Sequence, residues 1–204
     1  MADIIGKCLL CKRCAANCPA KTQIDRVVVA ARAQLVKEKG LGAIKNFAFR
    51  KVMADRKAFG KYARLMQKFQ WMMPKTGGKI RHLPDFVKNL GRRNFPELAK
   101  TFLRDQVKPV YKPQNGQKPI MRVGFFTGCA TDFVYPEFGL KFIDFLTRHG
   151  VEVVVPDTQN CCGAAIYFSG DFETGRMLAD LNIKAFKDLD VDYIVTTCAT
   201  CSST

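Results

Sequence analysis

The C-terminal part of the chain alternates between short apolar runs and longer amphipathic stretches. Residues 121–128, 151–157 and 192–198 are rich in β-branched and aromatic side chains and predict strands, whereas residues 131–149 and 171–189 have helical periodicity. Apolar strands that are joined by helices are typical of parallel sheets with right-handed crossovers. This part of the chain is therefore predicted to form a Rossmann-like α/β layer with a short parallel sheet, in the order βαβαβ.

The N-terminal part of the chain is helical by pattern. Residues 25–39 carry apolar side chains at helical spacing, and Gly40 is placed as a helix stop. Residues 43–119 predict short amphipathic helices that end in a linker at 108–119. The residues expected to break these helices are Pro74, Gly77, Gly78, Pro84, Gly91 and Pro96. We therefore expect an α+β protein overall, with its helical part first.

One helix of the central zone has two contrasting sets of side chains between residues 57 and 73. The apolar set recurs at helical spacing and comprises Phe59, Tyr62, Leu65, Met66, Phe69, Met72 and Met73, and the basic set comprises Lys57, Lys61, Arg64 and Lys68. A surface helix that packs its apolar stripe on the core has this pattern. A helix that lies on an anionic membrane also has it, with Trp71 near its end, as does a helix that binds an acidic partner protein.

Basic residues are concentrated in the same zone. Residues 45–118 hold 19 Lys or Arg against 4 Asp or Glu, an excess that equals the net charge of the whole chain, +15. Such a segment is expected to meet something anionic. No apolar run is long enough for a membrane span, and the first residues lack the plan of a secretory signal. We expect a cytoplasmic protein, with a peripheral position on the inner face of the cytoplasmic membrane as a further option.

Four of the nine cysteines form a tight run near the N-terminus. Cys8, Cys11, Cys14 and Cys18, followed by Pro19, have the C-x2-C-x2-C-x3-C-P spacing of bacterial ferredoxins, which predicts a [4Fe–4S] cubane. In two-cluster ferredoxins the fourth cysteine ligates the other cluster, yet this chain has only one run. We expect that an upstream run has been lost and that the chain is truncated. The alternatives are ligation of one cubane by all four cysteines and a structural zinc knuckle.

The other five cysteines follow the three predicted strands. They are Cys129 after the first strand, Cys161 and Cys162 after the second, and Cys198 and Cys201 after the third. Because the carboxyl ends of parallel strands meet at one edge of a sheet, we expect these thiols to converge there. Gly163 gives the backbone the freedom that two adjacent cysteines need to face one site. Thiolates suit both iron–sulfur clusters and zinc, so both are candidates.

The spacing of these five cysteines resembles a known family. The pattern Cys129-x31-Cys161-Cys162-Gly163-x34-Cys198-x2-Cys201 is similar to the CCG cysteine-rich domain of heterodisulfide reductase and of the iron–sulfur subunits of glycolate oxidase, D-lactate dehydrogenase and anaerobic glycerol-3-phosphate dehydrogenase. Those dehydrogenase subunits usually carry two ferredoxin runs and two CCG domains. The resemblance therefore implies a fragment with an α-helical 4Fe–4S ferredoxin-type domain at 1–42, a basic helical segment and linker at 43–119, and a CCG domain at 120–204 that is incomplete at the C-terminus.

The resemblance also implies what the chain binds and does. It implies a non-cubane [4Fe–4S] cluster or a zinc ion at the five CCG cysteines and a cubane at the first run. Electrons would pass from a flavoprotein dehydrogenase, of the 2-hydroxy acid or glycerol-3-phosphate type, to quinone or another carrier. We expect an oxidoreductase subunit without catalytic residues of its own, with the substrate chemistry on the partner; a heterodisulfide-reductase-like disulfide reductase subunit is the alternative.

A zinc-binding structural or nucleic-acid-binding protein belongs to a different class, and the strong positive charge is typical of nucleic-acid modules. Two features of the sequence are against it. The cysteines do not form two separated C-x2-C pairs, and the two histidines, His82 and His149, are remote from the cysteines. No nucleic-acid partner is therefore expected.

Overall fold

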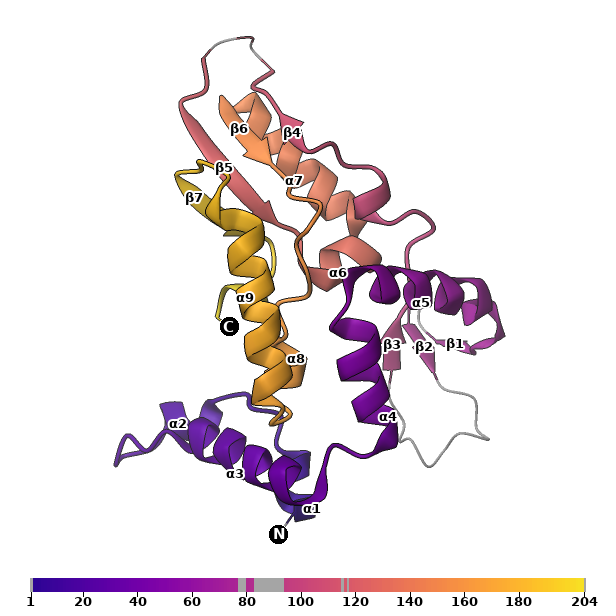
Figure 1. Ribbon diagram of the computed structural model, residues 1–204, viewed down its shortest axis with the longest axis vertical. Coiled ribbons are helices and arrows are strands. Elements are labelled where there is room, and N and C mark those ends of the chain that lie inside the picture. Colours follow the sequence, from indigo (N-terminus) through magenta and orange to yellow (C-terminus); the bar gives the residue numbers. More distant parts are fainter. Residues whose placement is uncertain (1, 77–79, 83–93, 115, 117, 204) are drawn as a thin grey trace.

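The centre of the protein is a mixed four-stranded sheet with the strand order β4-β6-β5-β7. The computed structural model describes residues 2–76, 80–82, 94–114, 116 and 118–203. The strands β5 (Met121–Phe126), β6 (Val151–Val154) and β7 (Tyr193–Thr196) are parallel, and β4 (Val110–Tyr111) pairs with β6 in the antiparallel sense. Figure 1 shows these strands at one end of an elongated molecule. The predicted strands and their parallel pairing are confirmed within a mixed α/β fold.

Strand β5 lies between its two parallel neighbours. Val123 is opposite Val153 on β6 and opposite Tyr193 on β7. Because β6 comes next in the chain and β7 comes last, the strand order reverses at β5, and such a reversal places the strand-end loops around a crevice. Strand β7 is the edge of the sheet, and Tyr193 and Ile194 on it are exposed.

Helices pack on both faces of the sheet, because successive residues of β5 point to opposite sides. On one side the ring of Phe125 lies 5.2 Å from that of Phe142 on α7 (Pro136–Arg148). On the other side Phe126 lies 5.9 Å from Phe186 on α9 (Phe172–Lys187). The core on the α7 side contains Leu103, Val123, Phe125, Ile143, Val151, Val153 and Val155.

The structure differs from the predicted C-terminal elements in three places. The helix expected at 131–149 is two helices, α6 (Gly128–Phe133) and α7, because Pro136 starts a new helix. Two single-turn helices, α8 (Ala164–Tyr167) and α10 (Ala199–Ser202), follow the cysteine loops. Strand β4 lies inside the segment expected as a linker, where Val110 pairs with Val154.

The N-terminal segment consists of helices that lie against the end of the C-terminal part. They are α1 (Ala2–Lys7), α2 (Arg13–Ala16) and α3 (Ile24–Lys39). Helix α3 confirms the helix expected at 25–39, and it ends before Gly40, whose φ of 72° is unfavourable for other residues. In Figure 1 α3 crosses below the end of α9 and the short helix α8.

The central zone is helical at first and then forms a small sheet. Its helices are α4 (Ala43–Asn46), a π-helix at Phe47–Met53, α5 (Arg56–Phe69), and 3-10 turns at Gln70–Met72 and Leu103–Asp105. Strands β1 (Lys75–Thr76), β2 (Ile80–His82) and β3 (Asn94–Pro96) pair antiparallel and were not predicted. The helix breaks expected at Gly77, Gly78, Pro84 and Gly91 lie outside the described residues.

Helix α5 docks through two small residues and the first side chain of its apolar stripe. Gly60 and Ala63 are buried, and the ring of Phe59 is tilted against that of Phe133 with 4.7 Å between ring centroids. The exposed side chains of the stripe are Tyr62, Leu65, Met66, Phe69 and Met72, with Trp71 beside them. Packing of the whole stripe on the core, one of the expected alternatives, is therefore wrong: most of the stripe faces solvent.

Candidate metal centre

The five C-terminal cysteines lie at the carboxyl ends of the three parallel strands. Cys129 is in the first turn of α6, directly after β5. Cys161 and Cys162 are in the loop between β6 and α8, and Cys198 and Cys201 are at the start and in the body of α10, after β7. Cys161 is buried and the other four are half-buried. The predicted convergence at one sheet edge is thus present in the structure.

Contacts between thiols join these cysteines into one continuous series. Cys129 interacts with Cys161, Cys161 with Cys162, Cys162 with Cys201, and Cys201 with Cys198, and each interaction shifts the pKa of at least one thiol of the pair. The series runs from α6 through the loop after β6 to α10. Cys129 and Cys198, which are 69 positions apart in the sequence, therefore lie at the same edge of the sheet.

The contacts set which sulfurs carry negative charge. Hydrogen bonds from Cys161 and Cys201 hold the pKa of Cys162 far below its usual value, although burial opposes this. A hydrogen bond from Cys161 likewise lowers the pKa of Cys129. The pKa of Cys161 is raised by its bonds to Cys129 and Cys162, and that of Cys201 by its bond to Cys162. The site thus favours thiolates at Cys129 and Cys162, and thiolates are the metal-binding form of cysteine.

Two glycines allow this close arrangement. Gly163 adopts φ of +78° at the N-cap of α8, directly after the cysteine pair. Gly128 adopts φ of +66°, and a Cβ atom at this position would lie 3.0 Å from Sγ of Cys201. A side chain at Gly128 would therefore crowd Sγ of Cys201, which would have to shift to make room.

Of the four cysteines of the N-terminal run, Cys14 lies on α2, and the other three lie in the segments before and after that helix. Cys8 and Cys18 are half-buried, whereas Cys11 and Cys14 are exposed. The amide of Leu10 lies 3.4 Å from Sγ of Cys8, and hydrogen bonds from the backbone and hydroxyl of Thr22 lower the pKa of Cys18.

The run also bends sharply. Leu10 and Lys12 have φ of 53° and 61°, which costs about 1 kcal/mol or more for each non-glycine residue. Across the described ranges, no group of three or more His, Cys, Asp or Glu side chains has the arrangement of a metal-ion site. The C-terminal thiols interact in neighbouring pairs, and the four N-terminal cysteines follow one another along a bent segment at positions 8, 11, 14 and 18.

Comparison with known proteins agrees with the geometry of the C-terminal site. A family model described as a cysteine-rich (CCG) domain matches residues 123–204. The chain carries a CCG domain. No solved structure matches the chain at a significant level.

Several curated proteins are similar to the chain. An uncharacterized iron–sulfur protein of Methanococcus maripaludis is 39% identical over 112 residues, which is 55% of this chain and 22% of that protein. A fumarate reductase (CoM/CoB) subunit of Methanothermobacter marburgensis is 40% identical over 89 residues, 44% of this chain and 18% of the relative. A probable glycolate oxidase iron–sulfur subunit of Bacillus subtilis is 28% identical over 98% of this chain and 46% of its own length. The chain thus spans less than half the length of these relatives.

Four polar residues that the sequence did not single out hold the loops of the CCG domain. The buried side chain of Gln159 accepts from the amide of Thr127, 2.9 Å away, and donates to the carbonyl of Pro156 at 3.0 Å. Asn182 on α9 accepts from the amide of Asn160 at 2.7 Å and donates to the carbonyl of Cys161 at 3.0 Å. Thr131 and Thr197 share a hydrogen bond of 2.8 Å between the loops after β5 and β7. The position of Gln159 shortly before the cysteine pair is a weak sequence signal for its role. No sequence signal points to Asn182.

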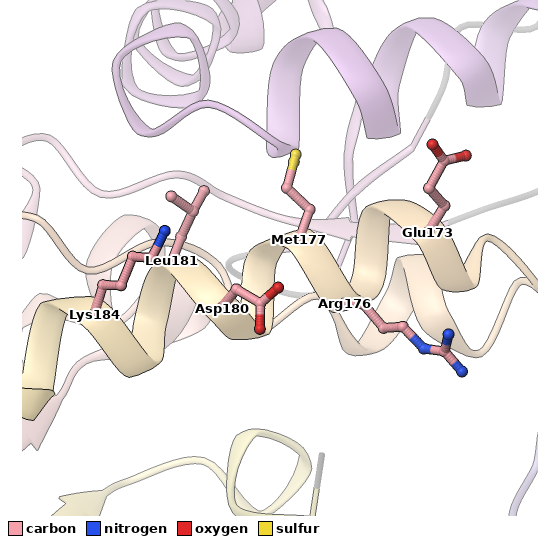
Figure 2. Close-up of a pocket in the computed structure, with 6 residues that line it drawn as sticks. All are labelled: Glu173, Arg176, Met177, Asp180, Leu181 and Lys184. Carbon is pink, nitrogen blue, oxygen red and sulfur yellow. The ribbon is translucent and has the colours of Figure 1, made fainter.

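Two hollows lie beside α9, and only one of them reaches the cysteines. Figure 2 shows six side chains of α9 that line a hollow of about 480 Å³, including Glu173, Arg176, Asp180 and Lys184. This hollow has mixed charge and no cysteine in its lining. A larger hollow of about 910 Å³ lies between α9, β7 and α10 and reaches Cys162 and Cys201. The second hollow is therefore part of the surroundings of the candidate metal centre.

None of the described helices is long and apolar enough to cross a membrane. His149 ends α7 as expected, with Nδ1 2.7 Å from the carbonyl oxygen of Phe145. The side chain of His82 lies outside the described residues.

Proposed function

We propose that this chain is an iron–sulfur electron-transfer subunit of an oxidoreductase. The observation that carries the proposal is the placement of five cysteines at the carboxyl ends of the parallel strands β5, β6 and β7. Cys129, Cys161, Cys162, Cys198 and Cys201 would hold one cluster, and Cys8, Cys11, Cys14 and Cys18 would hold a [4Fe–4S] cubane. A bound cluster would store and release single electrons.

The donor set fits such a group. All nine candidate ligands are cysteines, and two of the C-terminal thiols have lowered pKa values, so they would bind as thiolates with little cost of deprotonation. We propose a non-cubane [4Fe–4S] cluster at the CCG site, with a zinc ion as the alternative, because thiolates serve both metals.

The partner we propose is a flavoprotein dehydrogenase of the 2-hydroxy acid or glycerol-3-phosphate type. The name of the B. subtilis relative, an iron–sulfur subunit of a probable glycolate oxidase, supports a partner of this class. Electrons would leave the partner's flavin, pass through the cysteine sites of this chain, and reach quinone or another carrier.

Disulfide reduction is the second candidate function, because the hollow of about 910 Å³ reaches Cys162 and Cys201. A small disulfide bound there would take two electrons from the flavoprotein donor and two protons from solvent, which breaks its S–S bond and gives two thiols. Oxidation of the reduced chain by small disulfides, with release of two thiols per disulfide, would support this candidate; electron transfer to quinone analogues without any reaction with disulfides would oppose it.

Peripheral binding to an anionic membrane is a further part of the proposal. On α5 the exposed apolar stripe lies beside the basic residues Lys57, Lys61 and Lys68, while Gly60 and Ala63 face the protein. A helix in the plane of a membrane needs this pairing of an apolar face with flanking cations. Trp71, 74% exposed at the end of α5, would sit at the level of the lipid headgroups.

Metal analysis tests the electron-transfer proposal. Protein purified without oxygen is expected to be brown and to hold roughly eight irons, from two four-iron clusters. Cys201→Ser should remove about half of this iron, whereas Ser202→Ala on the same helix should leave it unchanged. Colourless protein with stoichiometric zinc would overturn the proposal, and about four irons with one zinc would reassign the CCG site to zinc.

Vesicle binding tests the membrane proposal. The chain should bind vesicles that contain anionic lipid, less so at high salt, and the triple variant Lys57→Glu, Lys61→Glu, Lys68→Glu should lose this binding. The matched control changes three lysines on α7 and α9 to Glu: Lys141, Lys184 and Lys187. Equal losses in both triple variants, or no binding by the wild type, would refute a membrane role for α5 and leave an acidic partner protein as its target.

A further inference from the structure

Arg32 on α3 contacts both the N-terminal cysteine run and the CCG domain. Its Nη2 atom donates to the carbonyl oxygens of Cys8, at 2.6 Å, and Ile5, at 2.9 Å. Its Nη1 atom donates to the carbonyl oxygen of Phe168, at 2.9 Å. Phe168 directly follows α8, the helix that begins after Cys162 and Gly163. One guanidinium group therefore joins the backbone of a candidate ligand in the first run to the loop that follows the cysteine pair of the second.

A glycine brings the two backbones into direct contact at the same place. Gly170 has φ of +98°, and a Cβ atom there would lie 2.6 Å from the carbonyl carbon and oxygen of Arg32 and 2.7 Å from the amide nitrogen of Ala33. These distances are too short for any side chain. The chain after α8 can therefore lie against α3 only because residue 170 is glycine. This close approach keeps the Arg32 guanidinium within reach of the carbonyl groups of Cys8 and Phe168.

Residues next to both cysteine groups meet at this contact. A cleft of about 360 Å³ is lined on one side by Leu9, Leu10 and Lys12 of the cysteine run and on the other by Thr200 and Ser203, which flank Cys201. Arg32 and Asp25 line the same cleft from α3. Neighbours of both cysteine groups therefore line one cleft.

We propose that Arg32 is a positioning residue that fixes the distance between the two cluster sites and places a positive charge beside the first. The inference rests on the proposed electron-transfer function, because it concerns the path between the two clusters. Electron transfer slows steeply as the distance between centres grows, so a fixed docking of the run on the CCG domain is needed for fast transfer. Arg32 provides it with a planar group that can bond several carbonyl oxygens at once.

The charge of Arg32 has a second consequence. Reduction adds an electron to a cluster and makes it more negative, and a cation nearby stabilises the reduced state. Because Arg32 bonds the carbonyl of Cys8, its charge is expected to raise the reduction potential of the cluster at the first run. Removal of the charge should lower that potential and leave the potential of the CCG site less affected.

Four variants separate docking from charge. Arg32→Gln removes both the charge and the forked donor, and Arg32→Lys keeps the charge but loses the fork. Arg26→Gln removes the same charge from an exposed position on the same helix and serves as the matched control. Gly170→Ala keeps Arg32 but forces α3 away from the turn after α8.

Hydrogen exchange and redox titration provide the readouts, on protein purified without oxygen. Amides of residues 5–18 should exchange at least tenfold faster in Arg32→Gln and Gly170→Ala than in the wild type. The reduction equilibrium of the first cluster should shift about tenfold toward the oxidised form in Arg32→Gln, which is 59 mV for one electron. Arg32→Lys should show the faster exchange with a smaller shift of potential, and Arg26→Gln should show neither change.

The outcomes distinguish this inference from the function on which it rests. Unchanged exchange in both Arg32→Gln and Gly170→Ala would overturn the docking role, even if both clusters were present. An equal shift of potential in Arg26→Gln and Arg32→Gln would overturn the specific effect of the charge. A wild-type protein without iron would refute the electron-transfer function, and the exchange comparison would still decide whether Arg32 docks the N-terminal run.

Discussion

Arg50 Nε lies 2.9 Å from Oδ2 of Asp171, and this pair joins the π-helix of the central zone to the N-cap of α9. The Asp171 side chain is 1% exposed, whereas that of Arg50 is 44% exposed. Asp171 also accepts from the hydroxyl of Thr174 at 2.8 Å. The two partners are therefore unequal: loss of Arg50 leaves a buried carboxylate, while loss of the carboxylate leaves an arginine that can turn to water.

This inequality predicts the order of two stability losses. Arg50→Gln should lower the free energy of unfolding by about 3 kcal/mol, because a buried charge loses its partner. Asp171→Asn should cost about 1–2 kcal/mol, since Asn still caps a helix but loses the charge-assisted bond. In urea unfolding, the loss of free energy of unfolding in the double variant should be smaller than the sum of the two single losses by at least about 0.5 kcal/mol. Additive losses would show that the pair is not coupled.

The same carboxylate predicts a dependence on pH. Burial alone would raise the pKa of Asp171, but the bonds from Arg50 and Thr174 outweigh it and hold the pKa below its usual value. A lowered pKa in the folded state stabilises the fold fully above the unfolded value of about 3.9, and this contribution is lost as pH falls through the folded pKa. Unfolding measured from about pH 6 down to about pH 2 should therefore show a steeper acid loss in the wild type than in Asp171→Asn, with the difference arising below about pH 4. Parallel curves would contradict the assignment.

Gly128 predicts an effect on metal content that is separate from backbone strain. Gly128→Ala places a Cβ atom 3.0 Å from Sγ of Cys201 at a φ of +66°. Gly116→Ala also places an alanine at a positive φ, +68°, with no atom of the described residues within 4 Å of its Cβ. Each should cost about 1 kcal/mol from φ alone, but only Gly128→Ala should lose the metal of the CCG site. Metal analysis of the two variants provides the measurement, and equal metal content would show that Cys201 tolerates the displacement.

Asn182 predicts a positioning effect on the cysteine loop. Asn182→Ala leaves the Asn160 amide and the Cys161 carbonyl without their side-chain partner, which should cost about 1–3 kcal/mol. The loop that carries Cys161 and Cys162 should then release its metal faster to a chelator. Lys184→Ala, on the same helix, is the control and should leave release unchanged. A variant that holds metal as long as the wild type would limit Asn182 to a purely structural role.

The sequence predicted the cysteine edge because two local rules were sufficient. Apolar runs that alternate with helical stretches indicate parallel strands, and parallel strands bring Cys129, Cys162 and Cys198 to one edge. The ligand sets themselves and the domain boundaries stay predictions. Strand β4 was missed because Val110 and Tyr111 stand between prolines, and their partner on β6 lies more than 40 positions away, beyond any local pattern.

The orientation of α5 could not be read from periodicity. Its large apolar residues form a regular stripe, and amphipathic helices commonly bury such a stripe. Here the buried face contains Gly60 and Ala63, whose small size permits close approach to the rest of the protein. Arg32 gave no signal either, because its partners are backbone carbonyl groups, which every residue possesses.

The position of β7 sets an order of events during synthesis. Cys198 and Cys201 emerge last among the nine cysteines and reach the other thiols only when β7 pairs with β5. Cys129, Cys161 and Cys162 leave the ribosome before Cys198 and Cys201 do. The five-cysteine site is thus completed only when β7 pairs with β5, so a cofactor that needs every thiol is loaded after these strands have paired, whereas the four cysteines of the run at Cys8–Cys18 emerge together within eleven residues.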